Sequence, residues 1–288
     1  MPILGAHQSI AGGYHRAIER AHQVGCQCVQ LFTKNNNQWK APPITPQQAA
    51  VFQTLAARLG VGHLLAHDSY LINLASPQPD LWRRSIRAFA AELRRAETLG
   101  IPYLVTHPGC YTSADPEFGL RRIIHALDAT HAETQGTKVR CLLETTAGQG
   151  TALGWRFEHL ARIMEAVRNP HLLGVCFDTC HVFAAGYALW PLRAYRATMR
   201  ALDKTVGLAS LKAIHLNDSA RDQGSRVDRH AHIGHGKIGL AAFACLLNDP
   251  NFQAVPMYLE TPKGTHQGED WDVINLRTLR QLVEGPGE

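Results

Sequence analysis

Short apolar segments alternate with longer helical segments eight times along this chain. The helical segments repeat apolar residues every three to four positions, which is typical of a helix that packs one face against a core. Short, wholly apolar strands are typical of parallel sheets that are covered by helices. The eight apolar segments are 3–7, 28–32, 61–66, 101–105, 139–143, 173–177, 213–216 and 255–259.

Eight such units predict an α/β fold, namely a closed (β/α)8 TIM barrel that we expect to include residues 1–288 as a single domain. An open, doubly wound sheet is the alternative. That fold normally carries a glycine-rich phosphate-binding turn after its first strand. The pair Gly12-Gly13 does not have this pattern, so the closed barrel is favoured.

The composition narrows the class of protein further. A length of 288 residues suits one α/β barrel, and a net charge of +5 favours anionic partners but is too small to establish nucleic-acid binding. The first residues lack a signal-peptide pattern, and no stretch of the sequence is apolar for long enough to span a membrane. We therefore expect a cytoplasmic protein without a membrane partner. The seven cysteines show no zinc-ribbon spacing, and we expect Cys141 and Cys176 to be buried thiols.

From the third strand onward, the strands end in side chains that can bind metal ions. The carboxyl ends of barrel strands gather at one mouth, so we expect these side chains to converge there. Two further candidates, Asp228 and His230, are separated by one residue and would point to the same side of an extended segment. The strand-end residues are His67, His107, Glu144, Asp178, His215 and Glu260, and the loop residues are His181, Asp228 and His230.

Each of these nine residues alone has an ordinary structural explanation, such as a hydrogen-bonded histidine or a helix cap. Together they place four carboxylates and five imidazoles at one mouth, with few Lys or Arg residues beside them. Buried carboxylates without partners are unfavourable, so the set predicts a cluster of divalent cations. Histidine and carboxylate ligands without thiolates suit Zn²⁺, with Mn²⁺ and Fe²⁺ as alternatives.

Nine ligands are too many for one ion, and we expect two or three ions with at least one bridging carboxylate. A centre of this kind supports metal-assisted hydrolysis, for which a phosphodiester is a good substrate. No arrangement of Ser, His and Asp and no nucleotide-binding loop competes with this interpretation.

Several motifs resemble those of the endonuclease IV family of apurinic/apyrimidinic endonucleases, which repair abasic DNA. They occur in the family's order along nearly the whole chain. The matching segments are 5–7, 31–35, 67–74, 107–109, 144–150, 174–181, 215–218, 224–230 and 260–262.

The resemblance implies three zinc ions per chain. His67, His107 and Glu144 would bind the first, and His181, Asp228 and His230 the third. The second would be bound by Glu144, as the bridge, with Asp178, His215 and Glu260.

The resemblance also implies the reaction. The family cleaves the phosphodiester 5′ to an abasic site in duplex DNA, leaves a 3′-hydroxyl and a 5′-deoxyribose phosphate, and trims blocked 3′ ends. Glu144 and Glu260 are the expected catalytic residues, with Glu260 orienting the attacking water. The partner would be duplex DNA with abasic sites or blocked 3′ ends, and the simplest expectation is a monomer.

Contacts with DNA are expected from three loops, one of which carries Gln38. Tyr70 and Leu71 match family residues that enter the duplex at the lesion, where an apolar or aromatic wedge can stabilise a kink; the alternative is that they pack under their own loop. Arg226 and Arg229 would bind phosphates or, alternatively, pair with Asp218 and Asp222.

The chain departs from the family pattern at two positions. Asn37 stands where the best-known members carry Arg, which removes one positive charge from a loop expected to enter DNA. The neighbouring Gln38 and Trp39 could compensate for this loss. His235 stands where an acidic residue is common. Neither departure touches the nine predicted ligands.

Two other functions remain open at this point. A sugar isomerase or epimerase on the same barrel needs about four ligands and one or two metal ions, so His181, Asp228 and His230 would have no role. A DNA-damage binding protein without catalytic activity would be favoured by the loss of a ligand, and none is lost. Zinc stoichiometry distinguishes the first alternative, and turnover distinguishes the second.

Overall fold

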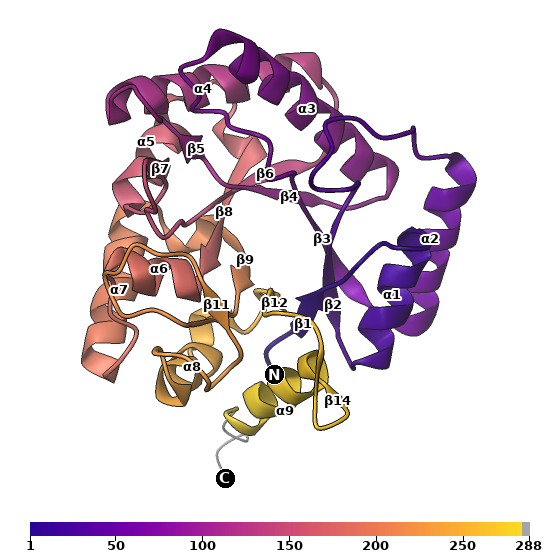
Figure 1. Cartoon of the computed structure of the whole chain (residues 1–288), viewed down its shortest axis with the longest axis vertical. Coiled ribbons are helices and arrows are strands. Elements are labelled where there is room, and N and C mark those ends of the chain that lie inside the picture. The colour runs from indigo at the N-terminus through magenta and orange to yellow at the C-terminus, as the bar shows by residue number, and fades with distance from the viewer. Residues whose placement is uncertain (284–288) are drawn as a thin grey trace.

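The computed structural model describes residues 1–283, and in this part of the chain eight parallel strands form a closed barrel (Figure 1). Around the barrel the order is β1-β12-β9-β8-β6-β4-β3-β2, so β1 closes the ring between the last strand and β2. The predicted TIM barrel is therefore confirmed. The strands are β1 (Leu4–His7), β2 (Cys28–Phe32), β3 (Gly62–His67), β4 (Tyr103–Thr106), β6 (Arg140–Glu144), β8 (Leu173–Asp178), β9 (Leu211–His215) and β12 (Met257–Leu259).

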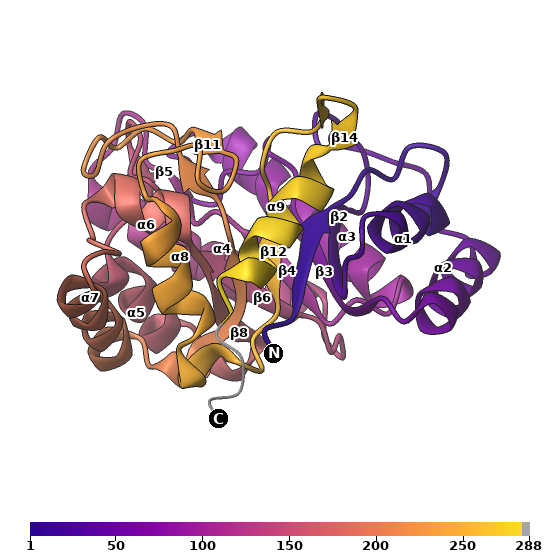
Figure 2. The same ribbon diagram turned by 90° about the horizontal axis from the view of Figure 1, so that it is seen from below.

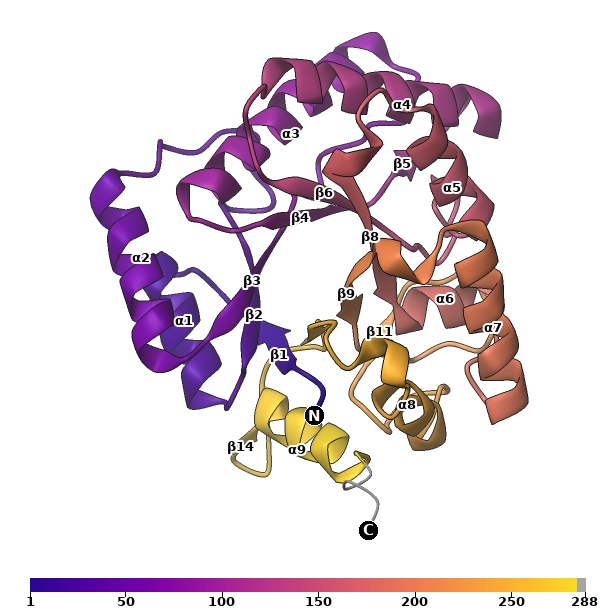
Figure 3. The same ribbon diagram turned by 180° about the vertical axis from the view of Figure 1, so that it is seen from behind.

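Helices surround the barrel on its outside (Figures 1 and 3). One of them, α6, was not predicted: it begins directly after β8 and precedes the longer α7. No helix within residues 1–283 is long and apolar enough to cross a membrane. The helices are α1 (Tyr14–Gln23), α2 (Pro46–Leu59), α3 (Pro79–Thr98), α4 (Pro116–Glu133), α5 (Phe157–Ala166), α6 (Thr179–Ala185), α7 (Leu192–Thr205), α8 (Leu240–Leu247) and α9 (Trp271–Gln281).

Three small two-stranded antiparallel sheets are formed by the loops at the end of the barrel opposite the N-terminus (Figure 2). They were not predicted, since two-residue strands leave no periodic signal in a sequence. They join β5 (Gly109–Cys110) to β7 (Ala152–Leu153), β10 (Asp218–Ser219) to β11 (His230–Ala231), and β13 (Thr265–His266) to β14 (Glu269–Asp270).

The start of α2 shows how local sequence sets a helix boundary. The side chain of Thr45 accepts a hydrogen bond from the backbone N–H of Gln48, whose own side chain accepts one from the backbone N–H of Thr45. This reciprocal capping satisfies two N–H groups that the helix leaves unpaired. Pro46 occupies the first turn, where its missing N–H has no cost.

Alternation along the strands divides the core into two parts. Residues on the outer face pack against the helices in one large cluster, and a smaller cluster fills the inside of the barrel. Cys141 and Cys176 are both buried and free, as predicted. The inner cluster consists of Cys28, Leu65, Val105, Leu142, Cys176, Ala213 and Tyr258.

A buried ion pair fixes the loop that follows β2. The ammonium group of Lys34 lies 2.9 Å from Glu92 Oε1 on α3, and both side chains are almost fully buried. Lys34 also donates a hydrogen bond of 2.7 Å to the carbonyl of Gln38. The hydroxyl of Thr33 donates to the other oxygen of Glu92. The loop is thereby attached to the helix layer at its base.

Removing one partner of this pair should destabilise the protein strongly. Lys34→Met leaves the Glu92 carboxylate buried without a cation, which should lower the free energy of unfolding by about 3–5 kcal/mol. The matched control is Arg162→Ala, which breaks the exposed pair of Arg162 and Glu117 (3.2 Å) and should cost less than about 1 kcal/mol. Denaturant titration measures both values. Equal losses in the two variants would show that the buried pair does not hold the loop.

Candidate metal centre

A polar layer lies directly above the inner apolar cluster of the barrel. Each residue of that cluster is followed, two positions later, by a polar residue that faces the same side of its strand. On β1, Gly5 takes the apolar position, because a side chain there would collide with the backbone of Cys28. The polar layer, counted from β1 around the chain, is His7, Gln30, His67, His107, Glu144, Asp178, His215 and Glu260.

Glu144 is the centre of this layer and is fully buried. Its Oε2 lies 3.2 Å from His67 Nε2 and 3.2 Å from His107 Nε2. Its Oε1 lies 2.9 Å from His215 Nδ1. One carboxylate thus faces imidazoles from both sides, which is the arrangement expected of a bridging ligand.

Ligand atoms gather in the sets expected from the sequence. His67, His107 and Glu144 each offer an atom within 4.8 Å of the others, and so do the four members of a second set: Glu144, Asp178, His215 and Glu260. These are the residues predicted for the first and second ions. The arrangement suits cations bound by imidazole nitrogen and carboxylate oxygen.

The third predicted set also comes together. His181 Nε2 lies 3.2 Å from Asp228 Oδ2, and His230 Nε2 lies 3.4 Å from Asp228 Oδ1. Asp178 is within reach of the same two histidines, and Cys180 is within reach of Asp228 and His230. Burial raises the pKa of Cys180 to about 12, and its thiol donates to the carbonyl of Arg229. The oxygen and nitrogen donors are therefore better suited to a cation than this sulfur.

Of the five histidines among the nine predicted ligands, four form a hydrogen bond with a carbonyl oxygen through one ring nitrogen. A carbonyl only accepts, so that nitrogen carries a proton, and in the neutral imidazole the other nitrogen presents its lone pair. This second contact is typical of histidines that bind metal ions. The pairs are His67 Nδ1 with the carbonyl of Asp68 (2.9 Å), His181 Nδ1 with that of Thr145 (2.9 Å), His230 Nδ1 with that of Glu260 (3.2 Å) and His215 Nε2 with Gln30 Oε1 (2.7 Å).

The pKa values of Glu260 and His67 show that the carboxylates of the cluster favour positive charge on the groups beside them. Burial alone would raise the pKa of Glu260, but His215 and other imidazoles lower it to about 2. Burial alone would lower the pKa of His67, but the hydrogen bond and charge of Glu144 raise it to about 9. Protonated imidazoles therefore balance the carboxylates within the protein. Divalent cations would replace those protons, since metal binding releases protons from its ligands.

Neutral side chains hold the candidate ligands in place, and the sequence analysis missed them. Asn217 donates from Nδ2 to Asp178 Oδ2 (2.7 Å) and accepts at Oδ1 from the backbone N–H of Glu260 (2.8 Å). Asp178 Oδ1 caps α6 by accepting from the backbone N–H of His181 (2.7 Å). Gln30 contacts both His215 and Glu260. Neutral amides lack any metal-binding signature, so only their positions identify them.

The predicted wedge residues lie beside the layer. Tyr70 is 67% exposed, so the alternative that it packs under its loop is wrong. Its ring centroid lies 5.4 Å from that of Phe32 and 6.3 Å from that of His67. Leu71 is partly buried, and Gln38 is exposed on the neighbouring loop. The aromatic ring therefore projects next to the candidate ligands.

The two arginines do not pair with Asp218 or Asp222, so that alternative is also wrong. The guanidinium of Arg226 stacks on Trp155, with Cζ 3.9 Å from the ring centroid. Arg229 donates to the carbonyl of Asp228 (2.9 Å). Both arginines are at least partly exposed.

Asp218 instead organises its own loop by accepting backbone N–H groups from Gly234, Gly236 and Ile238. A side chain at Gly236 would collide with the Asp218 carboxylate. His235, between the two glycines, packs against the Trp271 ring at a centroid distance of 5.3 Å.

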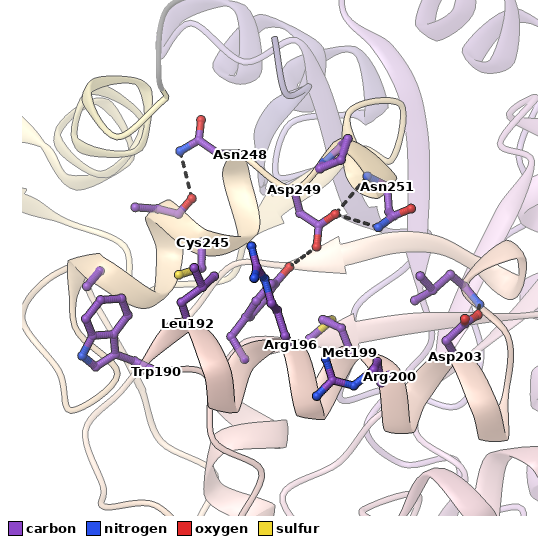
Figure 4. A pocket seen from close by; sticks show the side chains of 15 residues that line it. Trp190, Leu192, Arg196, Met199, Arg200, Asp203, Cys245, Asn248, Asp249 and Asn251 are labelled. Atoms are coloured by element: carbon purple, nitrogen blue, oxygen red, sulfur yellow. Dashed lines mark hydrogen bonds between the residues drawn. The ribbon is translucent and has the colours of Figure 1, made fainter. Parts of the chain in front are cut away.

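A cavity of about 820 Å³ lies elsewhere, between α7 and α8 on the outside of the barrel (Figure 4). Its lining includes Trp190, Arg196 and Asp249 but none of the nine predicted ligands. The nine predicted ligands therefore lie away from this cavity, at the mouth of the barrel.

The family described as xylose isomerase-like TIM barrel matches residues 18–282. Probable endonuclease 4 of Chloroflexus aurantiacus is 52% identical over 285 residues, which cover 99% of both chains. Probable endonuclease 4 of Citrifermentans bemidjiense is 47% identical, over 99% of this chain and all of the relative.

Two solved structures resemble this chain in fold, but only one of them is also similar in sequence. The crystal structure of endonuclease IV from Thermus thermophilus has a TM-score of 0.86 and 36% identity, with 98% of each chain covered. A D-tagatose 3-epimerase-like protein has a TM-score of 0.72 over 96% of each chain, but at 16% identity it shows the fold alone. From the close relatives and the Thermus structure, the chain belongs to the endonuclease IV family.

Proposed function

We propose that this protein, a DNA repair endonuclease by its family, hydrolyses the phosphodiester 5′ to abasic sites in duplex DNA. The products would be a 3′-hydroxyl and a 5′-deoxyribose phosphate, and blocked 3′ ends would be trimmed at the same site. The observation that carries this proposal is the gathering of the nine predicted ligands in linked sets, which share the buried Glu144 and Asp178 and extend through His181 and His230 to Asp228. The chain is proposed to act as a monomer and as one domain.

The donor set fits three zinc ions, bound in the three sets described above with Glu144 shared between the first two. When bound, zinc supplies a water molecule of lowered pKa and offsets the negative charge of phosphate oxygens. Glu144 is closed off from solvent by the imidazoles around it, so its role is to bind and not to contact DNA.

Glu260 differs from Glu144 in its access to solvent, since its side chain is 17% exposed and that of Glu144 is fully buried. Its Oε2 lies 3.1 Å from His215 Nδ1, and Gln30 holds Oε1. A carboxylate that faces both the ligand cluster and the open mouth can accept a proton from a water molecule and orient its attack. This is the role proposed for Glu260.

DNA would be bound by exposed residues at the rim of the mouth. Tyr70, with Leu71 behind it, is the proposed wedge, because an exposed aromatic ring can unstack a base step and stabilise a kink. An abasic nucleotide is also easier to extrude than a paired one. Gln38, Arg226 and Arg229 are accessible to solvent and are proposed to contact the DNA backbone.

Glu260→Gln should abolish incision without unfolding the protein. The amide keeps the size of the side chain but cannot accept a proton, so the rate should fall by roughly 100-fold to 10,000-fold. The measurement is cutting of a duplex with one tetrahydrofuran-type site, which excludes β-elimination, beside an undamaged duplex. Glu269→Gln, at a solvent-accessible glutamate paired with Arg277, is the matched control and should cut normally. A wild-type protein with full zinc occupancy that does not cut would contradict the proposed activity.

Zinc content tests the three-ion centre directly. Elemental analysis should find about three zinc ions per wild-type chain and about two in Asp228→Ala, which removes a ligand of the third set only. Asp222→Ala changes an exposed aspartate near Lys237 and should leave the count unchanged. Chelation should remove both zinc and activity, and added zinc should restore them. One or two ions in the wild-type chain would favour an epimerase-like centre.

Tyr70→Ala should weaken binding to abasic duplex while zinc content stays unchanged. Loss of an aromatic contact with a base is worth about 1–3 kcal/mol, or on the order of tenfold or more in Kd. Trp190→Ala is the control, because Trp190 is similarly exposed (53%) but lies beside the cavity between α7 and α8 (Figure 4). Fluorescence anisotropy with labelled duplex gives both values. Unchanged affinity in Tyr70→Ala would exclude the wedge.

A further inference from the structure

Gln30 is an amide among charged and titratable groups. It lies on β2, two residues beyond Cys28 of the inner apolar cluster, and it is fully buried. Of the eight residues in the polar layer, it is the one that carries neither a carboxylate nor an imidazole. Its backbone pairs in register with His7 on β1, which brings its side chain toward β12 and β9 across the barrel.

All the hydrogen-bonding groups of this side chain find partners within the layer. Oε1 lies 2.7 Å from His215 Nε2, and Nε2 donates to Glu260 Oε1 at 2.5 Å. Nε2 also lies 3.0 Å from His7 Nδ1. The opposite orientation of the amide would place its oxygen against the Glu260 carboxylate. The network therefore selects one orientation, with the oxygen toward His215.

We infer that Gln30 is a positioning residue for His215 and Glu260 in the proposed metal centre. By accepting from His215 Nε2, it keeps the proton on that nitrogen and leaves Nδ1 free to face Glu144 and Glu260. By donating to Glu260 Oε1, it turns Oε2 toward His215 Nδ1. This inference rests on the proposed function, and it assigns a task to a residue that is itself no ligand.

The alternative tautomer shows why His215 needs this acceptor. Without Gln30, the proton of a neutral His215 would favour Nδ1, because Glu144 Oε1 lies 2.9 Å from that nitrogen and can accept its hydrogen bond. A protonated Nδ1 cannot bind a cation, and Nε2 points away from the cluster. Side chains that orient a ligating imidazole in this way typically change metal affinity or activity by about 10- to 100-fold when removed.

A neutral amide suits both contacts at once. A carboxylate at position 30 could accept from His215 but would repel Glu260, and a cation would compete with the metal ions for the carboxylates. An apolar side chain would leave the N–H of the fully buried His215 without a partner, which is unfavourable. Among uncharged side chains of this length, the amide provides one acceptor and two donors.

The test compares Gln30→Met with Gln30→Glu. Methionine keeps the length and volume but forms neither hydrogen bond, whereas glutamate restores the acceptor for His215 and loses the donor to Glu260. Gln8→Met is the matched control, because Gln8 is also a buried glutamine but donates to Asp272 (2.7 Å), outside the predicted ligands. Zinc affinity is measured by competition with a chelator, and kcat and KM are measured on the tetrahydrofuran-site duplex.

We expect Gln30→Met to lose about 10- to 100-fold in affinity for one zinc ion and a similar factor in kcat, with KM unchanged. Gln30→Glu should regain zinc affinity but not kcat, and Gln8→Met should match the wild type in both. Gln30→Met with zinc affinity and kcat close to those of the wild type would overturn the inference, as would a loss confined to KM. If the wild-type chain takes up no zinc, the proposed metal centre fails first, and the role of Gln30 fails with it.

Discussion

The buried carboxylate of Glu144 is the constraint on which the rest of the site depends. An uncompensated charge at this depth would cost several kcal/mol, so the surroundings must supply positive charge from more than one side. His67 and His107 face one oxygen and His215 faces the other. These imidazoles come from different strands, so the closed barrel is what allows one carboxylate to meet them all. An open sheet would leave one side of Glu144 unpaired.

The residues around the cluster explain how it keeps its geometry. Backbone carbonyls orient three of the imidazoles, and side-chain amides orient His215, Asp178 and Glu260. Groups held in this way do not have to reorganise when a cation or a substrate arrives. The depth of each residue also separates the proposed roles: the fully buried Glu144 is proposed to bind metal ions, whereas Glu260 and the exposed Tyr70 face the open mouth. The proposed chemistry and the proposed DNA recognition thus lie next to each other but depend on different side chains.

Much of this arrangement follows from periodicity. Eight strand–helix units predicted the closed barrel, and the type of residue at the strand ends predicted which side chains would gather. That these side chains bind zinc stays a prediction. The tertiary structure excluded two alternatives that the sequence left open, since Tyr70 does not pack under its loop and Arg226 and Arg229 do not pair with Asp218 or Asp222. The added helix α6 was also unexpected, because seven residues directly after a strand leave little helical periodicity.

The sequence by itself determined the barrel, the end of the barrel at which the polar layer lies, and the nine candidate ligands. These properties depend on patterns within single strands and the loops that follow them, and such local patterns can be recognised in the sequence. The tertiary structure alone decided which neutral groups support the ligands. Gln30 and His215 are 185 positions apart and meet only because the barrel closes with β1 and β12 between their strands. No local pattern records such a contact, since it depends on the register and stagger of strands that are not neighbours.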